Sequence, residues 1–248
     1  MIRKAACIAA IALVLGASLA GAQGRRGGMG GPGRGNANPS AIVSAELAFA
    51  RLAQDKGQWT AFRETADKDA VMFMPDAVNA QSWLKKRADP ARALSWQPYR
   101  VFVSCDGTYA LSTGPWSGPN GGGGTFNTIW RRQKDGDYKW VVDFGSPRET
   151  PKQDEVIIEG KVAECRGGRR PDGFDVEGLD DRRRPPRNPP VTLIANPPPL
   201  SGDGQSNDGS LHWRWTKGEK ENSFEVTMRE SGGDQKVVIH EVVPNGAP

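Results

Sequence analysis

Two consecutive hairpins limit the folds open to this chain more than any other feature of its sequence. Each pairs two segments of alternating apolar side chains through an Asp-Gly step, at Asp106-Gly107 and at Asp135-Gly136. Asp-Gly between alternating strands is the strongest short-range hairpin signal, because these residues tolerate the positive φ angles of a tight turn. We therefore expect an antiparallel sheet whose strands cover residues 95–104, 109–117, 124–132 and 138–144.

Helical patterns come before the hairpins. From Ser40 to near Gly57 the apolar residues recur at helical spacing, with Ser40 able to cap the helix and Gly57 able to end it. The other elements predicted before the hairpins are a short helix beginning at Trp59, a strand over residues 70–74 and a third helix over residues 81–87. Helices and strands in this order predict an α+β fold.

The first 40 residues are not expected to belong to that fold. Residues 1–22 combine a positive start, an apolar run too short to span a bilayer and the small-residue exit Ala20-Gly21-Ala22. This pattern is typical of a secretory signal peptide cut near Ala22. It predicts an exported, periplasmic protein with no stable membrane insertion. Residues 23–40 are rich in Gly and Arg and predict a flexible tether.

Two more segments follow the hairpins. Residues 148–209 predict a strand near residues 156–162 and then a linker rich in Pro and Arg. Residues 210–248 alternate like an antiparallel meander of three strands. So thin a meander is not stable alone, and we expect it to pack on the first domain.

The net charge and the cysteines limit which partners and which compartment we expect for this protein. The formal net charge of +4 is too small to favour a polyanionic partner such as a nucleic acid. Outside the predicted signal peptide the chain has Cys105 and Cys165. In an oxidising compartment these two could form one disulfide, or they could remain independent small residues in strands.

The order of elements and several segments resemble a known superfamily. The segments "FMPDAVNAQSWLKKR", "LSWQP", "STGPWS" and "TIWRRQKDGDYKWVVDFG" make residues 41–147 similar to the SnoaL-like, ketosteroid isomerase-like group of the nuclear transport factor 2-like superfamily. The resemblance implies a cone-shaped curved antiparallel sheet wrapped around N-terminal helices and enclosing a hydrophobic pocket. It also implies that two copies can pair as a homodimer. Functions in this group range from isomerisation and cyclisation to plain binding, so the resemblance predicts fold better than activity.

Asp143 is the candidate catalytic residue. Strict alternation places it on the strand face opposite Trp140, Val142 and Phe144. If its face lines the pocket, burial would raise its pKa and suit it to act as a general base, with a Tyr or Trp as hydrogen-bond donor. If the other face lines the pocket, Asp143 pairs with Arg131 on the neighbouring strand. We favour the structural pair.

Aromatic residues are the candidate ligand contacts. Those that could line a pocket for a flat apolar molecule are Trp59, Phe73, Trp83, Trp96, Tyr109, Trp116 and Trp130. The two histidines of the chain, His212 and His240, lie in the meander, which leaves the predicted pocket without an imidazole base or metal ligand. No phosphate loop, zinc motif or cofactor motif is recognisable, so neither a metal nor a cofactor is expected.

Three functions follow from these features. We favour an exported protein that binds a small apolar or amphipathic molecule without catalysis. The second interpretation is a histidine-free isomerase, cyclase or lyase with Asp143 as general base. The third is a cell-envelope interaction protein whose sheet dimerises and whose tail or linker binds a partner.

Overall fold

The computed structural model describes residues 37–147, 157–166 and 201–245. The predicted signal peptide, nearly all of the tether and most of the Pro/Arg-rich linker lie outside the described residues. In the part of the chain that the structure describes, no helix is both long and apolar enough to cross a membrane.

Three helices form the N-terminal part of the fold. They are α1 (Pro39–Lys56), α2 (Gln58–Thr65) and α3 (Ala80–Leu84). The cap of α1 is Asn38, whose side chain accepts from the Ser40 amide at 3.1 Å, so the expected Ser40 cap is wrong by two positions. Gly57, with a φ of 106°, ends α1 as expected and starts α2 directly.

The main sheet of the described residues is mixed rather than purely antiparallel. Its order is β2-β1-β7-β6-β5-β4-β8, with β3 also paired to β5. Two of its pairings, β1 with β7 and β4 with β8, are parallel. The strands are β1 (Ala66–Phe73), β2 (Ala77–Asn79), β3 (Ser95–Trp96), β4 (Arg100–Val103), β5 (Tyr109–Ser117), β6 (Gly123–Arg132), β7 (Tyr138–Pro147) and β8 (Glu159–Val162).

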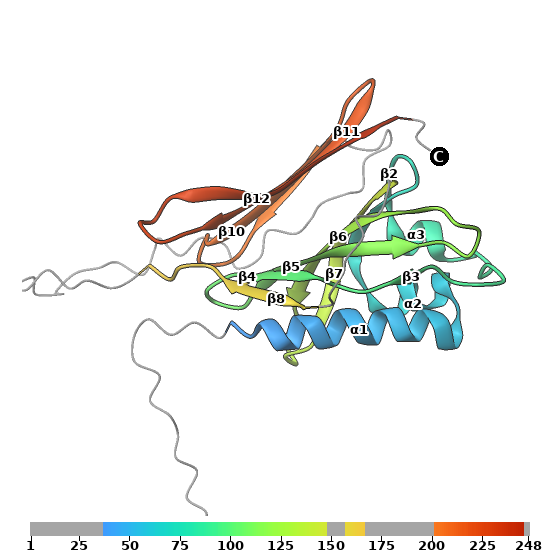
Figure 1. The fold of residues 1–248 in the computed structure, drawn as a ribbon, viewed down its shortest axis with the longest axis horizontal. Coiled ribbons are helices and arrows are strands. Elements are labelled where there is room, and N and C mark those ends of the chain that lie inside the picture. The colour runs from blue at the N-terminus through green and yellow to red at the C-terminus, as the bar shows by residue number, and fades with distance from the viewer. Residues whose placement is uncertain (1–36, 148–156, 167–200, 246–248) are drawn as a thin grey trace, which may run out of the picture. The chain divides into compact units, whose positions relative to one another are not determined.

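Both Asp-Gly turns are confirmed. Gly107 and Gly136 have φ angles of 68° and 98°, and they join β4 to β5 and β6 to β7. The first predicted strand, residues 95–104, is divided into β3 and β4. The strand is interrupted at Pro98, because proline has no amide hydrogen to donate to a neighbouring strand. The helices pack on one face of the curved sheet, which confirms the α+β cone expected for residues 41–147 (Figure 1).

The C-terminal tail has four strands, one more than predicted. They are β9 (Ser201–Gln205), β10 (Leu211–Lys217), β11 (Glu221–Arg229) and β12 (Gln235–Pro244), in the antiparallel order β12-β11-β10-β9. The extra strand, β9, has no apolar side chain and falls inside the predicted linker. Its Gly202 and Gly204 lie directly against the Trp215 and Trp213 indoles, where a Cβ would come within 2.6 Å and 2.4 Å.

The tail sheet packs on the face of the main sheet that the helices leave open. Phe224 stacks on Phe144 with ring centroids 5.3 Å apart, and Trp215 meets Phe73 edge-on at 5.3 Å. These residues belong to one hydrophobic core shared by the two sheets. The expectation that the meander packs on the first domain is confirmed.

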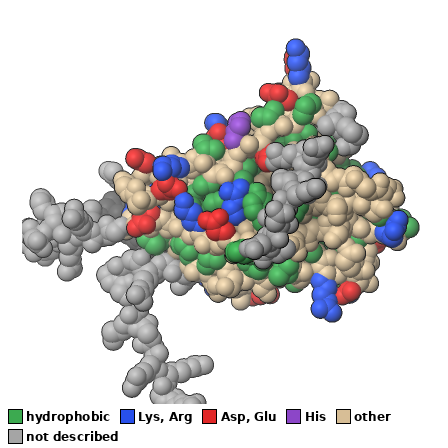
Figure 2. All heavy atoms as spheres, in the orientation of Figure 1, with side chains coloured by type: hydrophobic (Ala, Val, Ile, Leu, Met, Phe, Trp, Pro, Cys, Tyr) green, Lys and Arg blue, Asp and Glu red, His purple; other side chains and the backbone are tan. Residues whose placement is uncertain are grey.

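Polar contacts also connect the two sheets, and a disulfide between the ends of β4 and β8 in the main sheet lies next to one of them. Glu230 binds Lys161 of β8 and Lys236 of β12, each at 2.6 Å. On the face shown in Figure 2, basic and acidic side chains lie beside one another. Cys105 and Cys165 are joined by a disulfide with their Cα atoms 5.2 Å apart, and the Cys105 amide donates to the Ser210 hydroxyl of the tail at 2.9 Å.

Candidate ligand cavity

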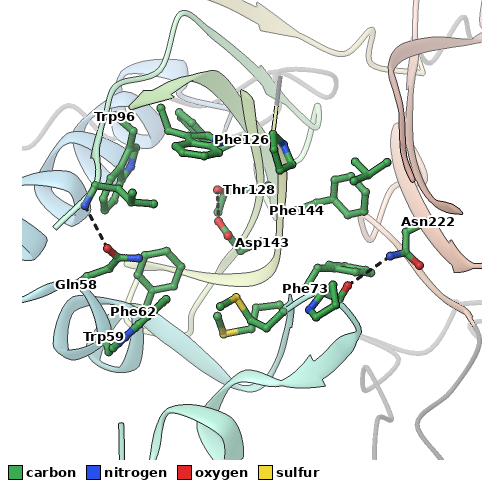
Figure 3. A pocket seen from close by; sticks show the side chains of 18 of the residues that line it. Gln58, Trp59, Phe62, Phe73, Trp96, Phe126, Thr128, Asp143, Phe144 and Asn222 are labelled. Carbon is green, nitrogen blue, oxygen red and sulfur yellow. Dashed lines mark hydrogen bonds between the residues drawn. The ribbon is translucent and has the colours of Figure 1, made fainter. Parts of the chain in front are cut away.

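A cavity of about 570 Å³ lies between the helices, the ends of β1 and β7, and the tail strands. Aromatic and other apolar side chains form most of its wall (Figure 3). Part of the wall comes from the tail, through Asn222 of β11 and Val243 and Pro244 of β12. The tail therefore completes the cavity as well as covering the sheet.

Four of the seven predicted aromatic contacts line this cavity: Trp59, Phe73, Trp96 and Trp116. Trp83 does not, because it packs edge-on against the far side of Trp59 at 5.2 Å and lies under Arg87. Tyr109 faces the core between the two sheets. Trp130 is buried beneath the cavity wall. Aromatic lining residues that were not predicted are Phe49, Phe62, Phe126 and Phe144.

Asp143 faces the cavity, and the reason is a bulge in β7. The register of β6 against β7 shifts so that Ile129 pairs with Val142 while Trp130 pairs with Trp140, which leaves Val141 as an extra residue. Strict alternation therefore fails between Trp140 and Val142. Asp143 lies on the helix side of the sheet with Trp140, and not opposite it as predicted.

The predicted pair between Asp143 and Arg131 is wrong. Arg131 binds Asp67 of β1 at 2.6 Å, with both side chains largely buried. Burial raises the pKa of Asp67, but the hydrogen bond and the charge of Arg131 outweigh burial and lower it overall. Arg131 therefore pairs with Asp67 and not with Asp143.

The Asp143 carboxyl has one hydrogen-bond partner among the described residues. Thr128 Oγ1 donates to Asp143 Oδ2 at 2.9 Å, and the carboxyl is otherwise turned toward the cavity (Figure 3). Burial raises the pKa of Asp143 to about 6, against the smaller lowering effect of the Thr128 hydrogen bond. A carboxyl with this pKa can both accept and release a proton near neutral pH.

A second buried carboxyl, Glu46, was missed by the sequence reasoning. It lies on the inner face of α1 and is fully buried. Its Oε1 accepts from Trp96 Nε1 at 2.7 Å, and its Oε2 accepts from Ser112 Oγ and, at 3.2 Å, from Trp130 Nε1. The sequence does indicate that Glu46 is buried, because its spacing places it on the same helix face as the apolar residues Ile42, Phe49 and Ala53.

Glu46 contacts residues of the cavity wall but is not itself part of that wall. Burial raises its pKa to about 7, and the nearby Asp143 charge raises it too, while the hydrogen bonds from Ser112 and Trp96 lower it. The bond to Trp96 orients an indole ring that lines the cavity. Glu46 itself does not reach the cavity surface, so its role here is to position Trp96.

Glu46→Gln is expected to change how stability depends on pH. The pKa of Glu46 rises from its ordinary value of 4.5 to about 7 on folding, so the unfolded chain loses this proton first as pH rises. The free energy of unfolding of the wild type should therefore fall by about 3 kcal/mol between those pH values because of this group.

Glutamine resembles the protonated acid, accepts from Trp96 and can donate to Ser112, so Glu46→Gln should lose that pH dependence. Urea unfolding at a series of pH values measures it, with the exposed Glu64→Gln as control. Equal pH slopes for Glu46→Gln and wild type would contradict the prediction.

Residues 39–147 fold into an α+β unit in which three helices pack on one face of a curved mixed sheet. Solved structures similar to this chain include the following three. A candidate ketosteroid isomerase from Parabacteroides distasonis has 18% identity and a TM-score of 0.36, over 46% of this chain and 90% of that chain. A nuclear transport factor 2-like protein of unknown function from Shewanella baltica has 14% identity and a TM-score of 0.34, and the match covers 45% of this chain and 94% of that chain. A candidate aromatic ring hydroxylase from Novosphingobium aromaticivorans has 14% identity and a TM-score of 0.33, and the match covers 43% of this chain and 86% of that chain. No protein-family model and no curated protein matches the sequence.

Proposed function

We propose that this protein binds a small, flat, apolar or amphipathic molecule in the cavity between its helices and its two sheets. The observation that carries the proposal is the cavity itself: about 570 Å³, walled by aromatic rings. This volume lies within the range of small-molecule sites, and a mostly apolar wall with few polar groups is their usual composition. A purely structural role for the aromatic residues would leave no such space.

We propose further that the protein works outside the cytoplasm. The predicted signal peptide supports this location, and so does the disulfide between Cys105 and Cys165, because such bonds persist in oxidising compartments. Pairing of two copies stays a prediction. The sheet face opposite the helices packs against the chain's own tail, so that face is not open to a second copy.

Proton transfer by Asp143 is the second candidate function. It is favoured by the carboxyl that faces the cavity with a pKa of about 6. A base in an apolar site can remove a proton next to a carbonyl group, and this step begins many isomerisations. Binding and proton transfer are compatible, since both use the same cavity.

Gly145→Leu tests the binding function by filling the cavity. Gly145 lies in the cavity wall, and a Cβ at this position would meet no atom within 4 Å. A larger side chain can therefore start from this position of the cavity wall without an immediate clash. We expect naphthalene to bind the wild type, and its dissociation constant, measured by equilibrium dialysis, to rise about tenfold to a hundredfold in Gly145→Leu because of steric overlap.

The matched control is Gly122→Leu, which adds the same side chain in open space outside the cavity wall. This control should bind naphthalene like the wild type. If wild-type protein bound no flat aromatic probe, or if both leucine variants lost affinity equally, the proposed binding site would be wrong.

A further inference from the structure

One polar side chain of the cavity wall has its orientation determined by a backbone amide. Gln58 is the first residue of α2, lines the cavity and is only 6% exposed. The Leu94 amide donates to Gln58 Oε1 at 3.1 Å. A backbone N–H can only donate, so the amide oxygen must face Leu94 and the amide nitrogen must face the other way. Figure 3 shows Gln58 Nε2 turned into the cavity.

Gln58 Nε2 has no hydrogen-bond acceptor among the described residues. A ligand that fills the cavity without offering an acceptor would leave this donor unpaired and away from water, which costs free energy, whereas a ligand with an acceptor avoids that cost. Two other donors near the cavity are already engaged: Trp96 Nε1 donates to Glu46, and Thr128 Oγ1 donates to Asp143. Neither Tyr99 nor Tyr109 lines the cavity, so the tyrosine donor considered from sequence is absent from its wall.

We propose that Gln58 is the specificity-determining residue of this site and donates a hydrogen bond from Nε2 to an oxygen of the ligand. The ligand is then a neutral, flat, mainly apolar molecule with one hydrogen-bond-accepting oxygen. An anionic ligand is disfavoured because Asp143 places a carboxyl in the same cavity. This inference rests on the proposed binding function and adds which ligands the site selects.

The expected selectivity follows from the cost of an unpaired donor. A pure hydrocarbon would seal Gln58 Nε2 away from water without an acceptor, whereas a carbonyl compound of the same shape would pair with it. We expect wild-type protein to bind 2-acetylnaphthalene about three- to tenfold more tightly than naphthalene, which is the usual range for one neutral hydrogen bond.

The decisive variant is Gln58→Glu, measured at mildly alkaline pH. The glutamate keeps an oxygen for the Leu94 amide but replaces the donor with an acceptor. We expect the dissociation constant of 2-acetylnaphthalene to rise about three- to tenfold while that of naphthalene stays within about twofold. The carbonyl stretching band of bound 2-acetylnaphthalene should move toward its position in an apolar solvent, which a merely structural role would not produce.

Two further variants make the test independent of folding defects. Gln58→Met keeps the size of the side chain without a donor and should lose the same selectivity if Gln58→Glu does not fold. Gln54→Glu is the control, because Gln54 contacts the Leu94 carbonyl at 2.6 Å from outside the cavity. Its selectivity should match the wild type.

The outcomes separate this inference from the proposed function. If naphthalene binds but 2-acetylnaphthalene has no advantage, or if Gln58→Glu weakens both probes equally, Gln58 does not select the ligand although the cavity binds. If neither probe binds the wild type, the proposed function is wrong and this inference is wrong with it.

Discussion

Asp143→Asn is expected to slow hydrogen exchange at the methyl group of bound 2-acetylnaphthalene by about 10²- to 10⁴-fold, the usual contribution of a positioned general base. In the proposed reaction, the Asp143 carboxylate removes a methyl proton and leaves an enolate, whose oxygen accepts from Gln58 Nε2. After Asp143 exchanges its proton with heavy water, it returns a deuteron to the same carbon. Asparagine cannot accept the proton. Proton NMR of the methyl signal in heavy water measures the rate.

The pH dependence of this exchange has a definite sign. Because burial raises the pKa of Asp143 to about 6, the rate should rise as pH increases through about 6 and level off above it, where the carboxyl is ionised. Thr128→Val removes the hydrogen bond that lowers this pKa, so its midpoint should lie higher than that of the wild type. The control is naphthalene binding, which Asp143→Asn should retain. Full exchange activity in this variant would show that another group is the base.

Replacing both bonded cysteines, as Cys105→Ser with Cys165→Ser, is expected to lower the free energy of unfolding by about 4 kcal/mol. The bond closes a loop with a sequence separation of 60, and the chain-entropy treatment assigns that amount to a loop of this length. Next to the bond, the Cys105 amide binds Ser210, and the Glu164 amide binds the Arg229 carbonyl at 2.9 Å. Loss of the bond should therefore also loosen the tail.

Urea unfolding of the oxidised wild type and the double variant measures the difference. Reductant provides the control. It should lower the free energy of unfolding of the wild type to that of the double variant and leave the value of the double variant unchanged. A difference below about 1 kcal/mol would mean that native packing alone holds these segments together.

Local sequence patterns predicted much of the fold. The hairpins at Asp106-Gly107 and Asp135-Gly136 and the helix that ends at Gly57 all occur where expected. Such elements depend on residues a few positions apart, which a single sequence displays directly. The strand β9 was missed because it has no apolar alternation. It pairs with β10, and the indoles of Trp215 and Trp213 leave no room for a Cβ at Gly202 and Gly204.

The candidate site was less predictable. Four aromatic lining residues were foreseen, but Gln58 and Glu46 were not, because their importance depends on partners far along the chain. Glu46 matters through Trp96 and Trp130, and Gln58 through Leu94, with separations of 50, 84 and 36 residues. Helical spacing indicates that Glu46 is buried, but nothing in the neighbouring sequence of either residue indicates which partners it contacts.

Asp143 shows most clearly where sequence reasoning ends. Its place in a strand, the absence of histidine from the cone and the presence of enough aromatic residues for a cavity wall all follow from the order of amino acids. Its direction does not, because a single extra residue at Val141 changes which side chains share a face. Tertiary packing also decided that Arg131 binds Asp67 and that the tail closes the cavity. Periodicity is a local property of the chain, whereas a cavity and its chemistry arise from groups that only folding brings together.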